Sequence, residues 1–168
     1  MFVPCMLAGV KIKEITKFPD ERGSFAEIFR DDWADFIEGD KIVQANLSFS
    51  YPGMIRAWHR HHRGQVDYFI TVRGATKICA YDDIPNSPTR GQLDEIISSE
   101  EKVQCVRIPG VYYHGFKSIG YEPALVVYLT TRMYDHKNPD EERRPWNDPT
   151  IIDPKSKKPY DWNASPHK

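Results

Sequence analysis

Residues 53–74, GMIRAWHRHHRGQVDYFITVRG, decide how this chain folds. Glycines at both ends predict turns, and the residues between them predict two consecutive β-strands. His59 and His61 lie two positions apart, so a strand presents both side chains on one face. Asp67 follows on the next strand, and His114 comes on a later strand, in the motif IPGVYYHGF. Because unpaired polar groups are costly to bury, four of them converging inside a small β-barrel predict a site.

Short strand-like segments recur between turn signals through most of the chain, which is typical of an all-β sandwich or barrel. They are VKIKEI, SFAEIF, KIVQANLSFS, MIRAWHRH, VDYFITV, ATKICAY, QLDEIIS, KVQCVRI and ALVVYLTT. Only residues 31–38, DDWADFIE, predict a helix, and it is short. We expect one domain over residues 1–168, with a barrel over about 10–134 and an irregular C-terminal tail over 135–168. The aromatic residues of the tail predict that parts of it dock on the barrel.

The composition argues against several classes of partner. The 23 basic and 24 acidic residues nearly cancel, which disfavours nucleic acid as a partner because phosphate binding needs a basic face. The N-terminal segment MFVPCMLAGV is apolar, but it lacks a basic flank and turns polar within a few residues, so we expect neither a signal peptide nor a membrane span. Cys5, Cys79 and Cys105 lack metal-type spacing and are expected to be reduced thiols of a cytoplasmic protein.

The spacing of the polar residues is close to the first and second motifs of the cupin superfamily, although the acid comes slightly later than usual. Three histidines and one carboxylate can bind Zn, Fe, Mn or Ni. One hypothesis is therefore a metal site made of His59, His61, Asp67 and His114. The alternative is that these are ordinary polar residues on a half-exposed sheet, and the crowding of three histidines into residues 59–62 disfavours it.

Seven motifs carry a narrower resemblance. In order along the chain they are DERGSFAEIF, QANLSFS, GMIRAWH, SPTRG, IPGVYYHGF, VYLTTRMY and WNDPTI. Together, from about Lys17 to Ile152, they resemble the dTDP-4-dehydrorhamnose 3,5-epimerases. The resemblance implies a cupin-type double-stranded β-helix, or jelly-roll barrel, that forms a homodimer. It also implies a nucleotide-linked 4-keto-6-deoxy sugar as substrate and no required metal.

In that family the reaction removes a proton from a carbon beside a ketone. Such a step takes a general base, a group that stabilises the enolate, and an acid on the opposite face of the ring. By resemblance, His59 is the base, Tyr128 is the acid, and Tyr134 is a second tyrosine of the site. Even spacing places both tyrosines on one strand face if the strand extends that far. From the pattern alone, the alternative for Tyr128 is a core aromatic residue in a valine-rich strand.

Further residues match positions that contact the substrate in this family. Arg56 matches an arginine near the diphosphate or the keto oxygen. Arg22 and Glu27 match residues that hold the nucleotide, often across the dimer interface. The remaining matches are the polar pocket residues Gln44 and Asn46, and His114, which lines the same cavity. For Arg22 taken alone, the alternative is a solvated arginine in a turn.

Two features depart from the family. Asp67 stands where the family has a lysine that stabilises the enolate, and a carboxylate beside an oxyanion has the wrong sign of charge. We expect either Arg56 to take over this role, or a cation bound by His61, Asp67 and His114 to restore positive charge. In the family an aspartate of a C-terminal segment orients the base, and this chain lacks that segment. The candidates for its replacement are Asp148, Asp153 and Asp161.

Three hypotheses follow. The leading one is a cytoplasmic sugar-nucleotide epimerase that acts at C3, or at C3 and C5, of a dTDP-4-keto-6-deoxyhexose and requires no cofactor. The second is a metal-dependent cupin isomerase or epimerase with one divalent transition metal such as Zn. The third is a non-catalytic module that binds a sugar nucleotide. The first two exclude each other at His59, because a histidine that ligates a metal cannot also accept a proton.

Overall fold

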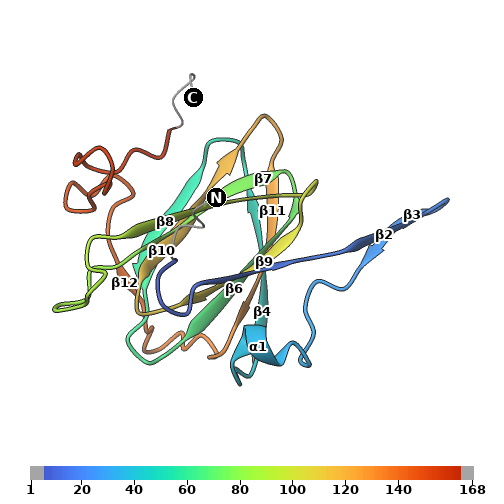
Figure 1. The fold of residues 1–168 in the computed structure, drawn as a ribbon, viewed down its shortest axis with the longest axis horizontal. Helices are drawn as coiled ribbons and strands as arrows, with labels where there is room; N and C mark the ends of the chain where they lie inside the picture. Colours follow the sequence, from blue (N-terminus) through green and yellow to red (C-terminus); the bar gives the residue numbers. More distant parts are fainter. Residues whose placement is uncertain (1–5, 164–168) are drawn as a thin grey trace.

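A computed structural model describes residues 6–163, which form a barrel of two facing β-sheets (Figure 1). The first sheet contains, in spatial order, β1 (Lys11–Glu14), β9 (Gln104–Pro109), β6 (Val66–Arg73), β11 (Ala124–Thr130) and β4 (Gln44–Ser50). The second contains β12 (Glu142–Arg143), β5 (Ile55–Arg60), β10 (Tyr113–Ile119), β7 (Ala75–Tyr81) and β8 (Leu93–Ser99). A separate hairpin consists of β2 (Lys17–Asp20) and β3 (Gly23–Ala26). Neighbouring strands pair antiparallel, and the predicted all-β jelly-roll class is confirmed.

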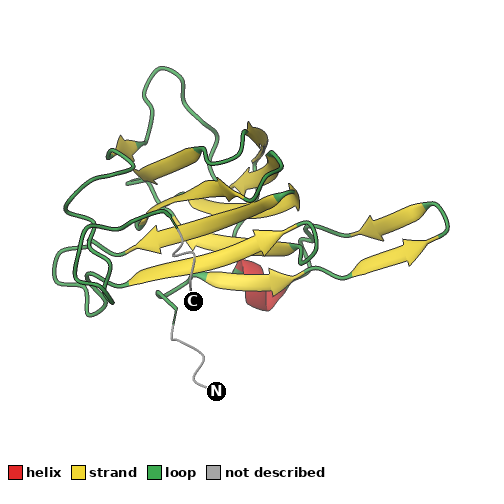
Figure 2. Ribbon diagram, turned by 90° about the horizontal axis from the view of Figure 1, so that it is seen from above, coloured by secondary structure: helices red, strands yellow, loops and turns green. Residues whose placement is uncertain are grey.

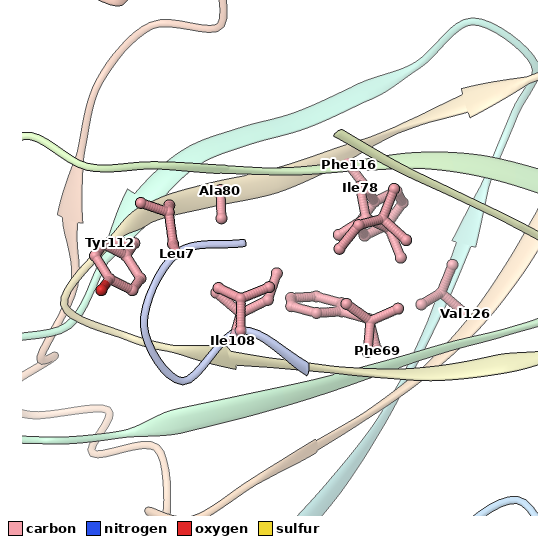
Figure 3. Close-up of a cluster of buried hydrophobic side chains, with 11 residues drawn as sticks. Leu7, Phe69, Ile78, Ala80, Ile108, Tyr112, Phe116 and Val126 are labelled. Atoms are coloured by element: carbon pink, nitrogen blue, oxygen red, sulfur yellow. The ribbon is translucent and has the colours of Figure 1, made fainter. Parts of the chain in front are cut away.

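Aliphatic and aromatic side chains fill the space between the sheets (Figure 3). Phe69 and Ile108 extend from the first sheet, and Ile78 and Phe116 face them from the second. Each of the four is at most 3% exposed. Burial of one such side chain contributes about 1.5–3 kcal/mol, so this layer is a main source of the barrel's stability.

The central strands are buried on both faces, which explains why VDYFITV and ATKICAY are almost continuously apolar. In β6, Tyr68 and Ile70 point outward and pack in a cluster with residues of the short helix. In β7, Cys79 and Tyr81 point outward into a second cluster that the C-terminal tail completes. Cys79 and Cys105 are buried free thiols, as predicted, and Cys5 lies outside the described residues.

The helix predicted over residues 31–38 is shorter in the structure. Within residues 6–163 the only α-helix is α1 (Ala34–Ile37), a single turn. Trp33 provides no side-chain cap at its start, and Glu38 adopts a left-handed conformation (φ 53°) that ends it. The helix forms because Phe36 and Ile37 bury themselves against the outer face of the first sheet. Packing therefore decides this element more than intrinsic propensity does.

Glycines at two positions allow the strands to approach closely. Gly74 turns β6 into β7 with a positive φ of 69°, and a Cβ there would lie 2.6 Å from the Pro123 carbonyl oxygen. A Cβ at Gly115 would lie 2.4 Å from the Cβ of Ala57. Glycine at this position therefore lets β10 approach β5 and brings the histidines of these two strands together.

The β2–β3 hairpin extends away from the barrel as an arm (Figure 1 and Figure 2). Its residues are mostly exposed, including Phe18 at 54% and Phe25 at 65%. The C-terminal tail instead returns to the barrel, where Ile151 and Trp162 are buried against the outer face of the second sheet. None of the helices formed by residues 6–163 has the length and hydrophobicity that a membrane span requires.

Candidate active site

A cavity of about 620 Å³ opens between the two sheets. Six of the predicted site residues line it: Gln44, Asn46, Arg56, His59, Tyr128 and Tyr134. His114 lies directly behind this lining, and its ring centroid is 4.3 Å from that of His59. Residues from both sheets and from the segment after β11 therefore meet around one space.

His59 lies near the end of β5, opposite His114 of β10. Burial disfavours the charged imidazolium, and His114 adds to this effect, so the pKa of His59 lies well below its usual 6.5. At neutral pH the ring is therefore uncharged. An uncharged imidazole that lines a cavity is in the form that can accept a proton.

Asp67 lies on β6 and is only 2% exposed. Its Oδ2 atom lies 2.8 Å from Nε2 of His114 and 3.4 Å from Nε2 of His61. The side-chain amide of Gln65 donates a hydrogen bond of 2.7 Å to Oδ1. Burial alone raises the pKa of Asp67, but the contacts with His114 and His61 outweigh it and lower the pKa below its usual range. The carboxylate is therefore ionised, and the side chains of His114, His61 and Gln65 contact its two oxygen atoms.

Backbone carbonyl groups orient two of the three histidine rings. Nδ1 of His114 lies 2.8 Å from the carbonyl oxygen of Tyr112, and Nδ1 of His61 lies 2.5 Å from that of Asp140. A carbonyl can only accept a hydrogen bond, so each Nδ1 carries a proton and donates it. Nε2 of both rings then faces Asp67. The four donor atoms of His59, His61, Asp67 and His114 lie within 4.8 Å of one another.

Tyr128 lies on β11 and stacks on Phe69, with 5.9 Å between the ring centroids. Burial, and then the charge of Asp67, raise the pKa of Tyr128, so its hydroxyl keeps its proton. Tyr134 lines the same cavity, but β11 ends at Thr130. The condition for both tyrosines to share one strand face, that the strand extends to Tyr134, is therefore not met, and Tyr134 reaches the cavity from the segment after β11.

Polar contacts hold the remaining cavity residues. The guanidinium of Arg56 donates hydrogen bonds of 2.9 Å to the Ser50 hydroxyl and 3.2 Å to the Phe49 carbonyl oxygen. The side-chain amide of Gln44 donates to the Asn46 side chain at 2.8 Å. These bonds fix donors and acceptors at the mouth of the cavity, where a polar ligand would meet them.

Arg22 and Glu27 do not line the cavity. Arg22 lies in the turn of the β2–β3 arm and forms a 2.5 Å ion pair with Asp20. Glu27 follows the arm and forms a 2.6 Å ion pair with Arg30. Within one chain, neither residue is placed to contact a ligand in the cavity.

The chain matches the family model of dTDP-4-dehydrorhamnose 3,5-epimerase over residues 4–156. This match covers every strand of the barrel and more than half of the tail. The chain belongs to this family. It is an epimerase of the isomerase class, and the resemblance carried by the seven motifs is confirmed.

Several relatives of this epimerase are similar over nearly their whole length. It is 42% identical over 158 residues to the probable low-salt glycan biosynthesis epimerase Agl13 of Haloferax volcanii, covering 94% of this chain and 96% of the relative. It is 37% identical to the spore coat polysaccharide biosynthesis protein SpsL of Bacillus subtilis, covering 95% and 98%. Among solved structures, the epimerase RmlC of Legionella pneumophila in complex with dTDP-4-keto-L-rhamnose superimposes with a TM-score of 0.78 at 29% identity. The match covers 88% of this chain and 78% of that one.

Three aspartates were candidates for orienting the base of this epimerase, but all three form hydrogen bonds with other residues. Asp148 accepts a hydrogen bond from Thr150, Asp153 from the backbone of Lys155, and Asp161 from Asn163. Within residues 6–163, none of them contacts His59. That prediction is wrong, because the tail containing them folds over the outer face of the second sheet.

Sequence reasoning also missed site residues. Glu141, Arg143 and Arg144 line the cavity from the segment around β12, and Gln65 holds Asp67. The two-residue strand β12 has no apolar alternation that would reveal it. Its position depends on pairing with β5, which is a long-range contact.

Proposed function

We propose that this epimerase acts on a dTDP-linked 4-keto-6-deoxyhexose and inverts it at C3, or at C3 and C5. The observation that carries this proposal is the placement of His59 and Tyr128 in the cavity. His59 belongs to the second sheet and Tyr128 to the first, so an uncharged base and a protonated phenol face the same space from opposite walls. Inversion requires removal of a proton from one face of the sugar ring and its return to the other.

In this mechanism, His59 removes the proton from the carbon beside the ketone. Negative charge then develops on the keto oxygen, and the family resemblance implies that Arg56, one of the arginines lining the cavity, lies near that oxygen or the diphosphate. Tyr128 returns a proton to the opposite face. These transfers involve no change of oxidation state, so they need no redox cofactor and proceed between side chains and substrate. Tyr134, Gln44 and Asn46 bind the polar groups of the ligand.

We also propose a homodimer in the cytoplasm. Large apolar side chains remain exposed on the edge strand β4 and on the arm, including Leu47 at 66%, Phe49 at 52% and Phe25 at 65%. Large apolar side chains exposed together on one strand are typical of interaction surfaces, and Phe49 also packs against exposed Tyr51, with 5.4 Å between the ring centroids. In such a dimer, the arm of one chain would lie near the cavity of the other chain. Arg22 and Glu27 of that arm would then have the nucleotide-binding role that the family resemblance implies. Light scattering should give twice the mass of one chain, and a monomer would contradict the dimer.

The experiment that tests the function follows solvent deuterium into the sugar. The wild-type protein should incorporate deuterium at C3, or at C3 and C5, of dTDP-4-keto-6-deoxyglucose in D₂O, whereas His59→Ala should slow incorporation about 10²–10⁴-fold because it removes the base. His62→Ala is the matched control, since the neighbouring His62 side chain is 58% exposed and points away from the cavity cluster. Near-wild-type incorporation in His59→Ala would remove His59 from the mechanism. Binding of the nucleotide sugar without any incorporation by the wild type would indicate a binding module instead.

A further inference from the structure

The inner end of the cavity holds a cluster of donor atoms that the proton transfers do not use. We propose that His61, Asp67 and His114 bind one divalent transition-metal ion there. The Oδ2 atom of Asp67 lies 3.4 Å from Nε2 of His61 and 2.8 Å from Nε2 of His114. Metal–ligand bonds of about 2.0–2.2 Å place tetrahedral donors about 3.4 Å apart. The first separation already matches this value, and the second is shorter because those atoms are in direct hydrogen-bond contact.

The groups around these three residues are arranged as the outer shell of a metal site. A histidine that ligates a metal characteristically donates its other ring N–H to a carbonyl or carboxylate, which fixes the ring and its tautomer. His61 and His114 do so with the carbonyl oxygens of Asp140 and Tyr112. Gln65 in turn holds Oδ1 of Asp67, so that Oδ2 is the atom turned toward the histidines. All three ligands are thus oriented from outside.

The charges also favour a cation. Asp67 is 2% exposed, and an ionised carboxylate at that depth needs a positive partner. Without an ion, both nitrogens of His114 face acceptors, because Nδ1 meets the Tyr112 carbonyl oxygen and Nε2 meets Asp67. A metal ion would be shared by Nε2 and the Asp67 carboxylate, and two imidazoles with one carboxylate form a donor set suited to Zn, Fe, Co or Ni.

His59 differs from the other two histidines. Among the described residues, no carbonyl or carboxylate holds either of its ring nitrogens, and the ring meets His114 edge-on. His59 therefore lacks the hydrogen bond to a backbone carbonyl that orients the rings of His61 and His114. The ion would leave His59 free as a base and would supply positive charge where the family resemblance expects a lysine in place of Asp67. This role rests on the proposed function, whereas the binding site itself does not.

The test uses the full chain, freed of metal with a chelator and titrated with Co²⁺, whose visible absorption reports imidazole and carboxylate ligation. We expect about one Co²⁺ per chain, displaced by Zn²⁺, and a rise in Tm of about 5–10 °C at a hundredfold excess over Kd. Asp67→Asn preserves the shape of the side chain and should abolish the absorption, as should His114→Gln. Gln65→Ala should weaken binding about 10–100-fold. His59→Asn and the exposed-site control His62→Gln should bind Co²⁺ like the wild type.

Failure of the folded wild-type chain to take up Co²⁺ or Zn²⁺ would overturn the site. So would equal uptake by folded Asp67→Asn, with far-ultraviolet circular dichroism verifying the fold. Loss of uptake in His59→Asn would overturn the assignment of three ligands. The role is measured separately, by deuterium incorporation with and without the ion, where we expect at least a tenfold gain with the ion bound. An unchanged rate would refute the role while the site stands, and absence of incorporation under both conditions would refute the proposed function instead.

Discussion

Trp162 offers the sharpest test of how the tail supports the active-site strand. Its side chain is 1% exposed, and its ring centroid lies 4.7 Å from that of Trp58, the residue before His59. Replacement by Ala removes a large buried ring and leaves a cavity, which typically costs about 3–5 kcal/mol. The carbonyl oxygen of Trp146, which accepts the Trp162 indole N–H at 3.0 Å, also accepts that of Trp58 at 3.3 Å. It therefore keeps a partner, so the cost is that of the cavity alone.

A loss of about 4 kcal/mol corresponds to a fall in Tm of about 8–16 °C for a chain of this size. We expect Trp162→Ala to lower the urea midpoint with an unchanged m-value, measured by far-ultraviolet circular dichroism because the substitution alters fluorescence. The matched control is Trp146→Ala, whose side chain is 52% exposed and whose backbone carbonyl remains in place. It should lose less than about 1 kcal/mol. A loss below about 1 kcal/mol for Trp162→Ala, or equal losses for both variants, would refute the reasoning.

Three further predictions concern catalysis, pH and assembly. Tyr128→Phe should slow product formation about 10²-fold while deuterium exchange falls less, because the phenol supplies the returning proton; equal losses in both assays would assign it to positioning. Hydrogen bonds to its carboxylate lower the pKa of Glu142 from 4.5 to about 2, and the bond from the Tyr113 hydroxyl has the largest effect. A lowered carboxyl pKa adds stability above about pH 4.5 that is lost as the pH falls toward 2, so Glu142→Gln should flatten the urea midpoint over that window. The effect should be about 1 kcal/mol, because the side chain is 37% exposed and solvent screens it; an unchanged pH slope would contradict this origin. Arg22→Ala should raise KM for the nucleotide sugar with little change in kcat if the arm reaches a partner's cavity, and unaltered KM would place Arg22 outside the site.

The strand order along the chain was predictable because local patterns encode it. Residues 53–74 predicted His59 and His61 on one strand face; the two side chains do meet in the cluster, although β5 ends at Arg60 and His61 follows it, and His62 points outward to Glu142. Gly74 indicated a turn, and in the structure it has a positive φ of 69°, a conformation that glycine adopts more readily than other residues. Burial of both faces explains why the segments around Asp67 are rich in apolar residues.

The position of Tyr134 shows where such reasoning stops. A period of two holds only while a strand continues, and β11 ends four residues before Tyr134. The same limit applies to the tail, where no alternation indicates which aspartate or arginine reaches the cavity. Arg143 does so through the short strand β12, and Asp161 does not.

By itself, the sequence determined the class of fold and the residue types available for chemistry, since strand alternation and turn glycines act over a few neighbouring residues. Only the tertiary structure decided which of these residues meet. Asp140 and Tyr112 contribute backbone carbonyls to the histidine cluster, and a carbonyl is present at every position, so no residue type marks them. The docking of Trp162 on Trp58 likewise joins residues a hundred positions apart. Such contacts form because the barrel and tail bury apolar surface together, which no local pattern records.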